Sequence, residues 1–349
     1  MEDKRAAAAP AAQTDKVSIV CRTLYDARRG RPARRHLCLA VLNAVTWARY
    51  AADVPLQLRI VGPSNERFAD FLKDLGIDVV TDVEPHPFAE TAATYNILRM
   101  LEDIPASSKR ILMVDNDTVF LQSAAELARE PADLLMASVA DKRRLDPDVA
   151  EQLTSELDAS FAAGSWVPWH ERFYARKEGR DPAVEEGLYF NSGVVLLPSG
   201  PDAARLERLW RDFGEQVTQF ALRQGLNQRR DLGSTQAALA LAAGQYGRVA
   251  QLSLKFHYRP PHFWWGDLRG DEIAIAHLFA SRPPFEALPA EQRCQPRQFL
   301  ESYWEAMVTR ELSDTPADLV KRNDAEFVRS RIIDALDHFE ITSVEAFLP

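Results

Sequence analysis

The chain has 349 residues, of which 46% are hydrophobic, so it can bury one large core or two smaller ones. Its formal net charge of -9 argues against general binding to nucleic acids or anionic membranes, because their phosphate groups attract positive surfaces. The basic run at 28–35 is a local exception.

The cysteines and the start of the chain indicate a cellular compartment. The three cysteines, Cys21, Cys38 and Cys294, show no metal-type spacing, and an odd number favours a reducing environment. No apolar run reaches the roughly 20 residues of a membrane-spanning helix. Residues 1–15 contain no apolar signal-peptide core and are expected to form a disordered tail. The sequence therefore predicts a cytoplasmic protein with no integral membrane segment.

Strand and helix patterns alternate along the first part of the chain. Apolar runs predict strands at 17–21, 56–61, 78–80, 110–114 and 134–139. Helical spacing of apolar residues predicts helices at 36–50, 66–75 and 91–102. This order predicts an α/β protein with a mostly parallel central sheet and flanking helices.

The second part of the chain departs from this alternation. Residues 142–188 are charged, contain proline and tryptophan, and are predicted to be an insertion with one helix near 148–161. Within it, Trp166 and Trp169 suit either an acceptor platform or core packing. A strand is predicted at 188–197, followed by a helix to 217 and an alanine-rich helix at 235–243. We expect a domain at 16–285 and a helical C-terminal extension at 286–349.

The run Arg110–Leu121 contains the most informative pattern. Four apolar residues lead directly into Asp115 and Asp117, which predicts a buried strand that delivers two carboxylates to its carboxyl end. Open α/β sheets bind their ligands at that end. Two carboxylates in this spacing can converge on one divalent cation if the chain turns. Hard oxygen ligands suit Mg²⁺ or Mn²⁺, which are normally shared with substrate phosphates.

Several blocks of the sequence, taken in order, resemble the GT-A glycosyltransferases of family 8, the group of glycogenin and the lipopolysaccharide galactosyltransferases. The blocks that carry the resemblance span residues 16–285 and are Val17–Tyr25 with His36–Val41, Tyr95–Arg99, Asp115–Asp117, Tyr189–Leu197 with Trp210, Gly233–Leu239 and Ile275–Pro283. The resemblance implies a GT-A fold and a hexosyltransferase that uses a nucleotide-diphosphate sugar, with a UDP-sugar expected. The acceptor would be a saccharide, lipid-linked or other hydroxyl, and the anomeric configuration would be retained.

The resemblance also assigns roles to single residues. Asp115, Asp117 and His277 would bind the metal, and the imidazole ligand favours Mn²⁺ over Mg²⁺. The metal would stabilise the charge that grows on the leaving diphosphate. The donor-binding residues implied are Tyr25, which would stack on the base, with Arg99, Asn191, Ser192, Gly193 and Arg282. The catalytic residues implied are Asn191 and Gln236, which would read sugar hydroxyls, and Arg282, which would donate to the diphosphate.

Some residues depart from the pattern of that family. Thr235 stands where the family has an acidic residue beside Gln236, and Arg22 and Thr23 stand where acidic residues precede the stacking tyrosine. These departures leave open a catalytically inactive protein that only binds sugar nucleotides. His277, between apolar neighbours, also suits a histidine of the core.

A second enzyme class remains open. Ile111–Val119 also resembles the nucleophile strand of haloacid-dehalogenase-type phosphatases, in which Asp115 would be the nucleophile. Gly266–Asp271 would then be the metal block and Lys255 the conserved lysine. Against this, more than 100 residues precede the strand, and His277 has no role.

Overall fold

The structure is a computed structural model that describes residues 19–28, 33–87, 93–103, 110–140, 145–168, 171, 175, 178–227, 232–259, 268–278, 288–312 and 322–348. The expected tail at 1–15 lies outside the described residues. Among the helices that are described, none has the length and apolar character needed to cross a lipid bilayer.

The elements alternate as the sequence predicts through the first part of the chain. The strands are β1 (Ile19–Asp26), β2 (Leu56–Val61), β3 (Asp78–Val83), β4 (Arg110–Val114), β5 (Thr118–Phe120), β6 (Leu135–Val139), β7 (Ala162–Trp166), β8 (Glu185–Leu188), β9 (Phe190–Leu197), β10 (Val249–Gln251) and β11 (Ile275–His277). The α-helices are α1 (Ala33–Tyr50), α2 (Glu66–Asp74), α3 (Pro147–Glu156), α5 (Pro201–Gln224), α6 (Ser234–Tyr246), α9 (Pro296–Leu312) and α10 (Arg322–His338). The 3₁₀ helices are η2 (Ala93–Leu101), η3 (Ala125–Arg129), η4 (Leu254–Phe256), η5 (Gly270–Glu272), η6 (Ala290–Cys294) and η8 (Glu345–Phe347).

The central sheet has seven strands in the order β10-β6-β9-β4-β1-β2-β3. β1 pairs in parallel with β2 and with β4, and β9 runs antiparallel between β4 and β6. The mostly parallel α/β sheet expected from the sequence is confirmed. Because β1 and β4 are adjacent and parallel, their carboxyl ends lie at the same edge, where open α/β sheets bind ligands.

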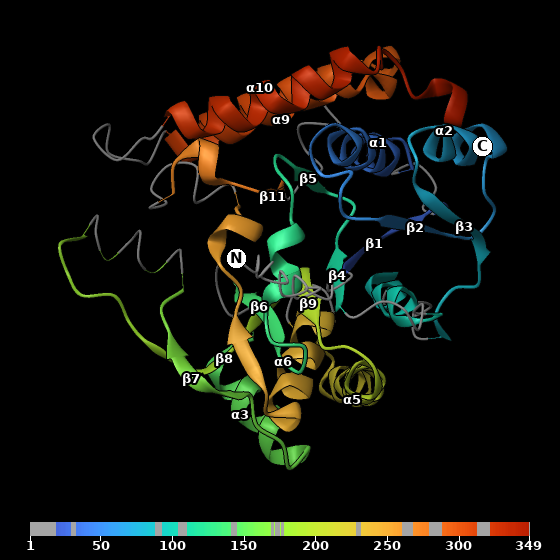
Figure 1. The fold of residues 1–349 in the computed structure, drawn as a ribbon. Coiled ribbons are helices and arrows are strands. Elements are labelled where there is room, and N and C mark those ends of the chain that lie inside the picture. Colours follow the sequence, from blue (N-terminus) through green and yellow to red (C-terminus); the bar gives the residue numbers. More distant parts are fainter. Residues whose placement is uncertain are drawn as a thin grey trace, which may run out of the picture.

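Helices cover both faces of the sheet (Figure 1). One hydrophobic cluster joins β1 and β2 with α1, α9 and α10, and the other joins η2, α3, α5 and α6 with the opposite face. The predicted C-terminal helices therefore share a core with α1. Polar contacts reinforce this packing, because Arg331 of α10 lies 3.6 Å from the ring centroid of Tyr50, whose hydroxyl donates to the Arg331 carbonyl at 2.9 Å.

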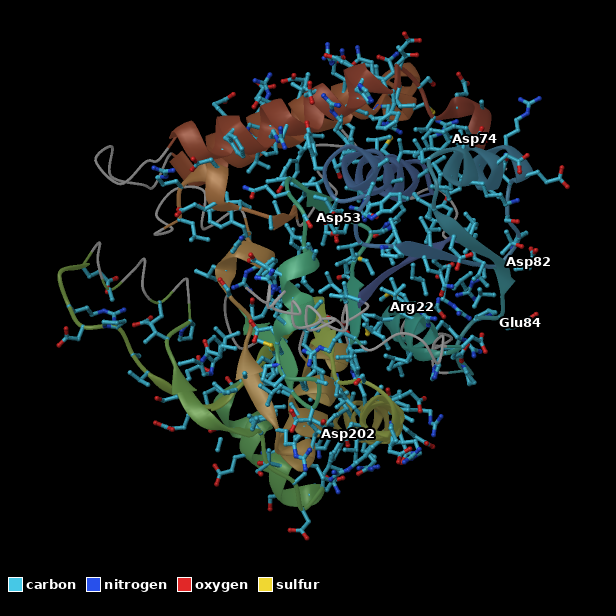
Figure 2. The ribbon with its side chains drawn as sticks, viewed as in Figure 1. Arg22, Asp53, Asp74, Asp82, Glu84 and Asp202 are labelled. Carbon is cyan, nitrogen blue, oxygen red and sulfur yellow. The ribbon has the colours of Figure 1, made fainter. Side chains whose placement is uncertain are left out.

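Several predicted elements differ from the structure, and three of these lie close to the central strands of the sheet. Residues 93–101 form a 3₁₀ helix in place of the predicted α-helix. The first strand continues beyond Cys21 to Asp26, because Cys21–Asp26 pair with Leu56–Val61 of β2. Within it, the buried Arg22 side chain donates to the carbonyls of Met100 and Asp103 at 2.8 and 2.7 Å. Figure 2 shows Arg22 between the sheet and that 3₁₀ helix. The strand expected at 188–197 is divided at Tyr189 into β8 and β9.

Two small antiparallel sheets accompany the central one. β5 pairs with β11, and β7 pairs with β8 inside the predicted insertion. Trp166 ends β7 at 4% exposure and donates from Nε1 to the Gly187 carbonyl at 3.0 Å, so it packs in the core. Trp169 lies outside the described residues.

Candidate metal centre

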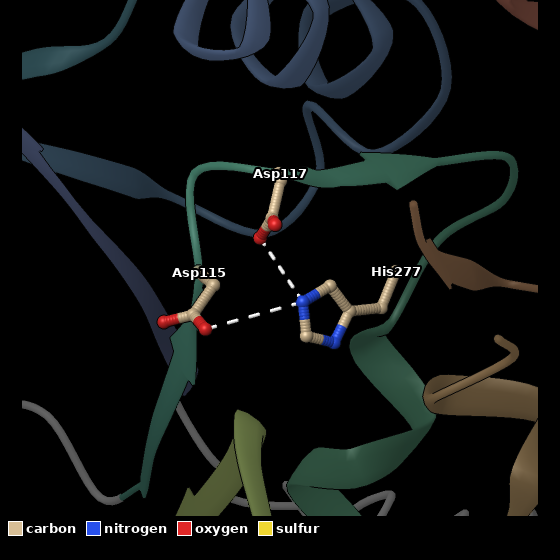
Figure 3. A group of neighbouring side chains, drawn as sticks. All are labelled: Asp115, Asp117 and His277. Carbon is tan, nitrogen blue, oxygen red and sulfur yellow. Dashed lines mark ion pairs between the residues drawn. The ribbon is translucent and has the colours of Figure 1, made fainter. Parts of the chain in front are cut away.

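Asp115, Asp117 and His277 come together at the carboxyl edge of the sheet (Figure 3). One ligand atom from each lies within 4.8 Å of the others. His277 Nε2 is 3.0 Å from Asp117 Oδ1 and 4.0 Å from Asp115 Oδ2. Adjacent octahedral ligands at about 2.1 Å from a cation lie roughly 3 Å apart, so the separation of His277 Nε2 and Asp117 Oδ1 matches that of neighbouring ligands of Mg²⁺ or Mn²⁺.

The backbone produces this convergence in two steps. Asp115 directly follows β4, and its carbonyl accepts from the Thr118 backbone N–H at 3.1 Å and from the Thr118 hydroxyl at 2.8 Å, which closes a tight turn. β5 then begins at Thr118 and pairs antiparallel with β11, with Thr118 opposite His277. The Asp117 carbonyl accepts from the Leu278 N–H at 2.8 Å. The turn and the small sheet therefore bring His277, which lies 160 positions downstream of Asp117, against the two aspartates.

A helix residue fixes this turn from behind. Asn43 of α1 is fully buried, and its side-chain amide donates to the carbonyl and the hydroxyl of Thr118 at 3.1 and 3.0 Å. A buried amide with two such bonds holds the loop between β4 and β5 in one position.

The three residues differ in exposure, and they shift one another's pKa values. The side chains of Asp115 and Asp117 are 37% and 23% exposed, whereas that of His277 is 4% exposed. Burial lowers the pKa of His277, but Asp117 and Asp115 outweigh this and raise it. Burial likewise raises the pKa of Asp117, and His277 outweighs it, so that pKa is lowered. The imidazole and carboxylate form an ion pair, and a cation would replace the Nε2 proton, because ligating imidazoles are unprotonated.

β9 places two further predicted residues beside His277. A Cβ atom added to Gly193 would lie 2.1 Å from His277 Cε1 and 3.0 Å from Asn191 Oδ1, so the ring rests directly on the glycine. The Gly193 N–H donates to Asn191 Oδ1 at 2.8 Å, and the Gly193 carbonyl accepts from the Asp115 N–H at 2.8 Å. Asn191 and Ser192 are buried. β9 thus links the turn that carries Asp115 and Asp117 to the residues expected to contact the donor.

Other predicted donor residues are engaged elsewhere. Tyr25 is 4% exposed, and its ring packs edge-on against Phe68 with centroids 5.4 Å apart. Arg99 forms an ion pair with Glu102 and donates to the Pro85 carbonyl at 2.8 Å. These contacts disfavour base stacking by Tyr25 and donor binding by Arg99, and both roles stay predictions.

The structure gives little information on the predicted catalytic roles of Gln236 and Arg282. Gln236 lies in the first turn of α6 and is half-buried, and the neighbouring Thr235 is buried with its carbonyl accepting from Trp210 Nε1 at 3.1 Å. Arg282 lies outside the described residues. The roles of Gln236 and Arg282 therefore stay predictions.

The sequence interpretation missed polar residues at the same edge. Asp26 ends β1 at 4% exposure and accepts from Asn96 Nδ2 at 2.8 Å and from Arg28 Nε at 3.1 Å. It was missed because the predicted strand ended at Cys21. Behind the metal centre, His257 Nε2 lies 3.0 Å from His277 Nδ1. No spacing signal in the sequence connects these two histidines.

The sequence matches no protein-family model and no curated protein. Similar solved structures include the galactosyltransferase LgtC with donor and acceptor sugar analogues, at 18% identity over 85% of this chain and 98% of that chain, with a TM-score of 0.46. An active-site mutant of LgtC has 16% identity over 87% and 99% of the chains and a TM-score of 0.49. Mouse xyloside xylosyltransferase 1 has 16% identity over 76% and 99% of the chains and a TM-score of 0.45. All three are glycosyltransferases, but likeness at this level carries no conclusion about the activity of this chain.

Proposed function

We propose that this chain is a metal-dependent GT-A glycosyltransferase that moves a hexose from a nucleotide-diphosphate sugar, specifically a UDP-sugar, to an acceptor hydroxyl with retention. The observation that carries this proposal is the convergence of Asp115, Asp117 and His277 at the carboxyl edge of a mostly parallel sheet. Two carboxylates and one imidazole match the ligands that Mn²⁺ accepts.

The surrounding residues support this chemistry. A metal held by the three side chains would stabilise negative charge on a leaving diphosphate. Asn191 lies beside His277. Its side-chain oxygen Oδ1 accepts from the Gly193 N–H, and its side-chain nitrogen Nδ2 can donate to a sugar hydroxyl. Arg282 would donate to the diphosphate.

The phosphatase alternative is less well supported. That chemistry needs a lysine beside the nucleophile, whereas Lys255 forms an ion pair with Glu126 at 2.7 Å. Asp271, from the candidate metal block, is paired with Arg269 at 2.6 Å. The acidic residue that lies beside Asp115 in the candidate metal centre is Asp117, and His277 is the third residue of that centre.

The metal site is tested with Asp117→Asn. We expect Mn²⁺-dependent binding of UDP, measured by isothermal titration, to weaken at least about tenfold, or ~1.4 kcal/mol, because a charged ligand is lost. Asp74→Asn is the matched control, since Asp74 is exposed at the end of α2, a helix that lies apart from β5 and β11 (Figure 1). Unchanged affinity in Asp117→Asn would remove the metal assignment.

The reaction class needs a second experiment. The wild-type protein is incubated with Mn²⁺ and a panel of UDP-sugars, and separately with p-nitrophenyl phosphate. We expect UDP to be released from some UDP-sugars of the panel and not from others, and we expect this release to be lost in Asp117→Asn. Phosphate release through a phosphorylated Asp115 would support the phosphatase instead. Binding of Mn²⁺ and UDP without turnover of any donor would favour the inactive sugar-nucleotide-binding protein.

A further inference from the structure

A second buried imidazole lies directly behind the candidate metal ligand. His257 is fully buried, and its Nε2 is 3.0 Å from Nδ1 of His277. The two rings are nearly parallel, with centroids 5.3 Å apart and an interplanar angle of 23°. His277 therefore uses its two nitrogens differently, with Nε2 towards the aspartates and Nδ1 towards His257.

The backbone fixes this pair of rings. His257 follows η4, and the next residue, Tyr258, forms a parallel bridge with Ala276 of β11. The Tyr258 N–H donates to the Ile275 carbonyl at 2.9 Å, and the Tyr258 carbonyl accepts from the His277 N–H at 2.7 Å. This register holds the segment with His257 alongside the strand that ends in His277. The contact between the rings is thus set by main-chain hydrogen bonds on both sides.

Only one proton can lie between two ring nitrogens at this distance. If His257 Nε2 carried it and donated to His277 Nδ1, a neutral His277 would carry its own proton on Nε2. That nitrogen could then not bind a cation. If His277 Nδ1 carries the proton and His257 Nε2 accepts it, the Nε2 lone pair of His277 points at the space between Asp115 and Asp117.

We propose that His257 is the positioning residue of this centre: its bare Nε2 accepts from His277 Nδ1–H and so holds His277 in the tautomer and orientation that bind a divalent cation through Nε2. This inference rests on the metal site of the proposed function. Metal-ligating histidines commonly donate their second N–H to a carboxylate, a carbonyl or water. Here the acceptor is a neutral imidazole, which adds no negative charge to the two aspartates.

The test compares two variants of His257. His257→Phe keeps a planar ring but removes the acceptor, and His257→Gln restores an acceptor oxygen near the position of Nε2. Mn²⁺ binding without donor is measured by electron paramagnetic resonance, with thermal unfolding of each metal-free protein. We expect His257→Phe to bind Mn²⁺ 10- to 100-fold more weakly and His257→Gln to stay within a few-fold of wild type. His338→Gln, at an exposed histidine at the end of α10, is the control and should bind as wild type.

The outcomes separate this inference from the metal site itself. Consider first that the wild type binds Mn²⁺ and that His277→Ala abolishes this binding. If His257→Phe then binds Mn²⁺ as well as the wild type does, the positioning role is wrong and the metal site stands. Equal loss in both His257 variants would also overturn the acceptor role and indicate packing alone. If the wild type binds no Mn²⁺, or His277→Ala has no effect, the metal site fails and the inference fails with it.

A measurement on the wild-type protein covers the case in which His257→Phe does not fold. Proton–nitrogen correlation spectra of histidine-labelled protein, saturated with diamagnetic Zn²⁺, report which nitrogen of each imidazole carries a proton. We expect His257 to carry its proton on Nδ1 and to have a bare Nε2. A proton on His257 Nε2 in the metal-loaded protein would refute the inference.

Discussion

Replacement of Gly193 by alanine tests how closely β9 packs against His277, the proposed metal ligand. The added Cβ would lie 2.1 Å from Cε1 and 2.3 Å from Nδ1 of His277. Non-bonded carbon atoms are stable at about 3.5 Å or more, so the ring would have to retreat by about 1.4 Å. Metal ligands tolerate displacements of about 0.2 Å, so a shift of this size should remove Nε2 from the coordination sphere.

The cost should appear in both binding and stability. The His277 side chain is buried and packed against His257, so the ring has little space into which it can retreat. Overpacking of this kind typically lowers the free energy of unfolding by about 1–3 kcal/mol. We expect Gly193→Ala to lose that amount in urea unfolding and to bind Mn²⁺ at least about tenfold more weakly in paramagnetic resonance titrations, because an imidazole ligand is displaced.

A double-mutant cycle identifies the cause. In a His277→Ala background the ring is absent, so Gly193→Ala should cost little further stability, with a coupling energy of about 0.5–3 kcal/mol. The same stability loss in both backgrounds would mean that the methyl group clashes elsewhere. Wild-type Mn²⁺ affinity together with wild-type stability in Gly193→Ala would refute the reasoning altogether.

Other contacts give further predictions. Asn43→Ala should cost about 1–3 kcal/mol in urea unfolding, because the buried amide that fixes the metal-binding turn is lost; a cost below about 0.5 kcal/mol would contradict that role. Tyr303→Phe removes a hydroxyl that donates to the carbonyl following the histidine ligand, whereas Tyr246→Phe removes a bond to a distant carbonyl. Each should cost about 1 kcal/mol, but only Tyr303→Phe should lower Mn²⁺ affinity; equal affinities would contradict the link. Burial and two nearby arginines lower the pKa of His86 to about 4, from an ordinary value of 6.5. The unfolded chain therefore takes up a proton below pH 6.5 before the folded protein does, so stability is full above pH 6.5 and falls towards pH 4, by at most about 3 kcal/mol. In urea unfolding at pH 7.5 and pH 5, His86→Gln should lose less stability than the wild type; an equal loss would contradict the assignment.

The sequence predicted correctly those helices and strands whose ends are set by residues close to them in the chain. β2 matches its predicted range because a six-residue strand pattern lies between Pro55 and Gly62. α2 begins after Asn65, whose side chain accepts from the Arg67 N–H at 2.9 Å, and it ends before Gly76. Such signals act within a few residues, so they can be read from one sequence.

Long-range contacts determined the elements that were missed. β5 and β11 are three residues each and are stable only as a pair, so neither has a recognisable pattern of its own. The pairing of His257 with His277 depends on the same part of the fold. The resemblance could identify Asp115, Asp117 and His277 as members of one site. The distances between their side chains depend on the turn after β4 and on this small sheet, which the sequence pattern does not reveal.

Arg22 shows how one missed contact changes the interpretation of the site. Because Arg22 stands where the family that the sequence resembles has an acidic residue, it left open an inactive protein. In the structure Arg22 is fully buried, and its guanidinium donates to the carbonyls of Met100, in the last turn of η2, and of Asp103 just after it, so it holds the end of that helix. Those bonds accompany a first strand that continues to Asp26, which places a carboxylate at the same edge as Asp115. An acidic group is therefore present at the carboxyl end of β1, where it is buried and accepts from Asn96 and Arg28, and Arg22 has a structural role of its own beside it.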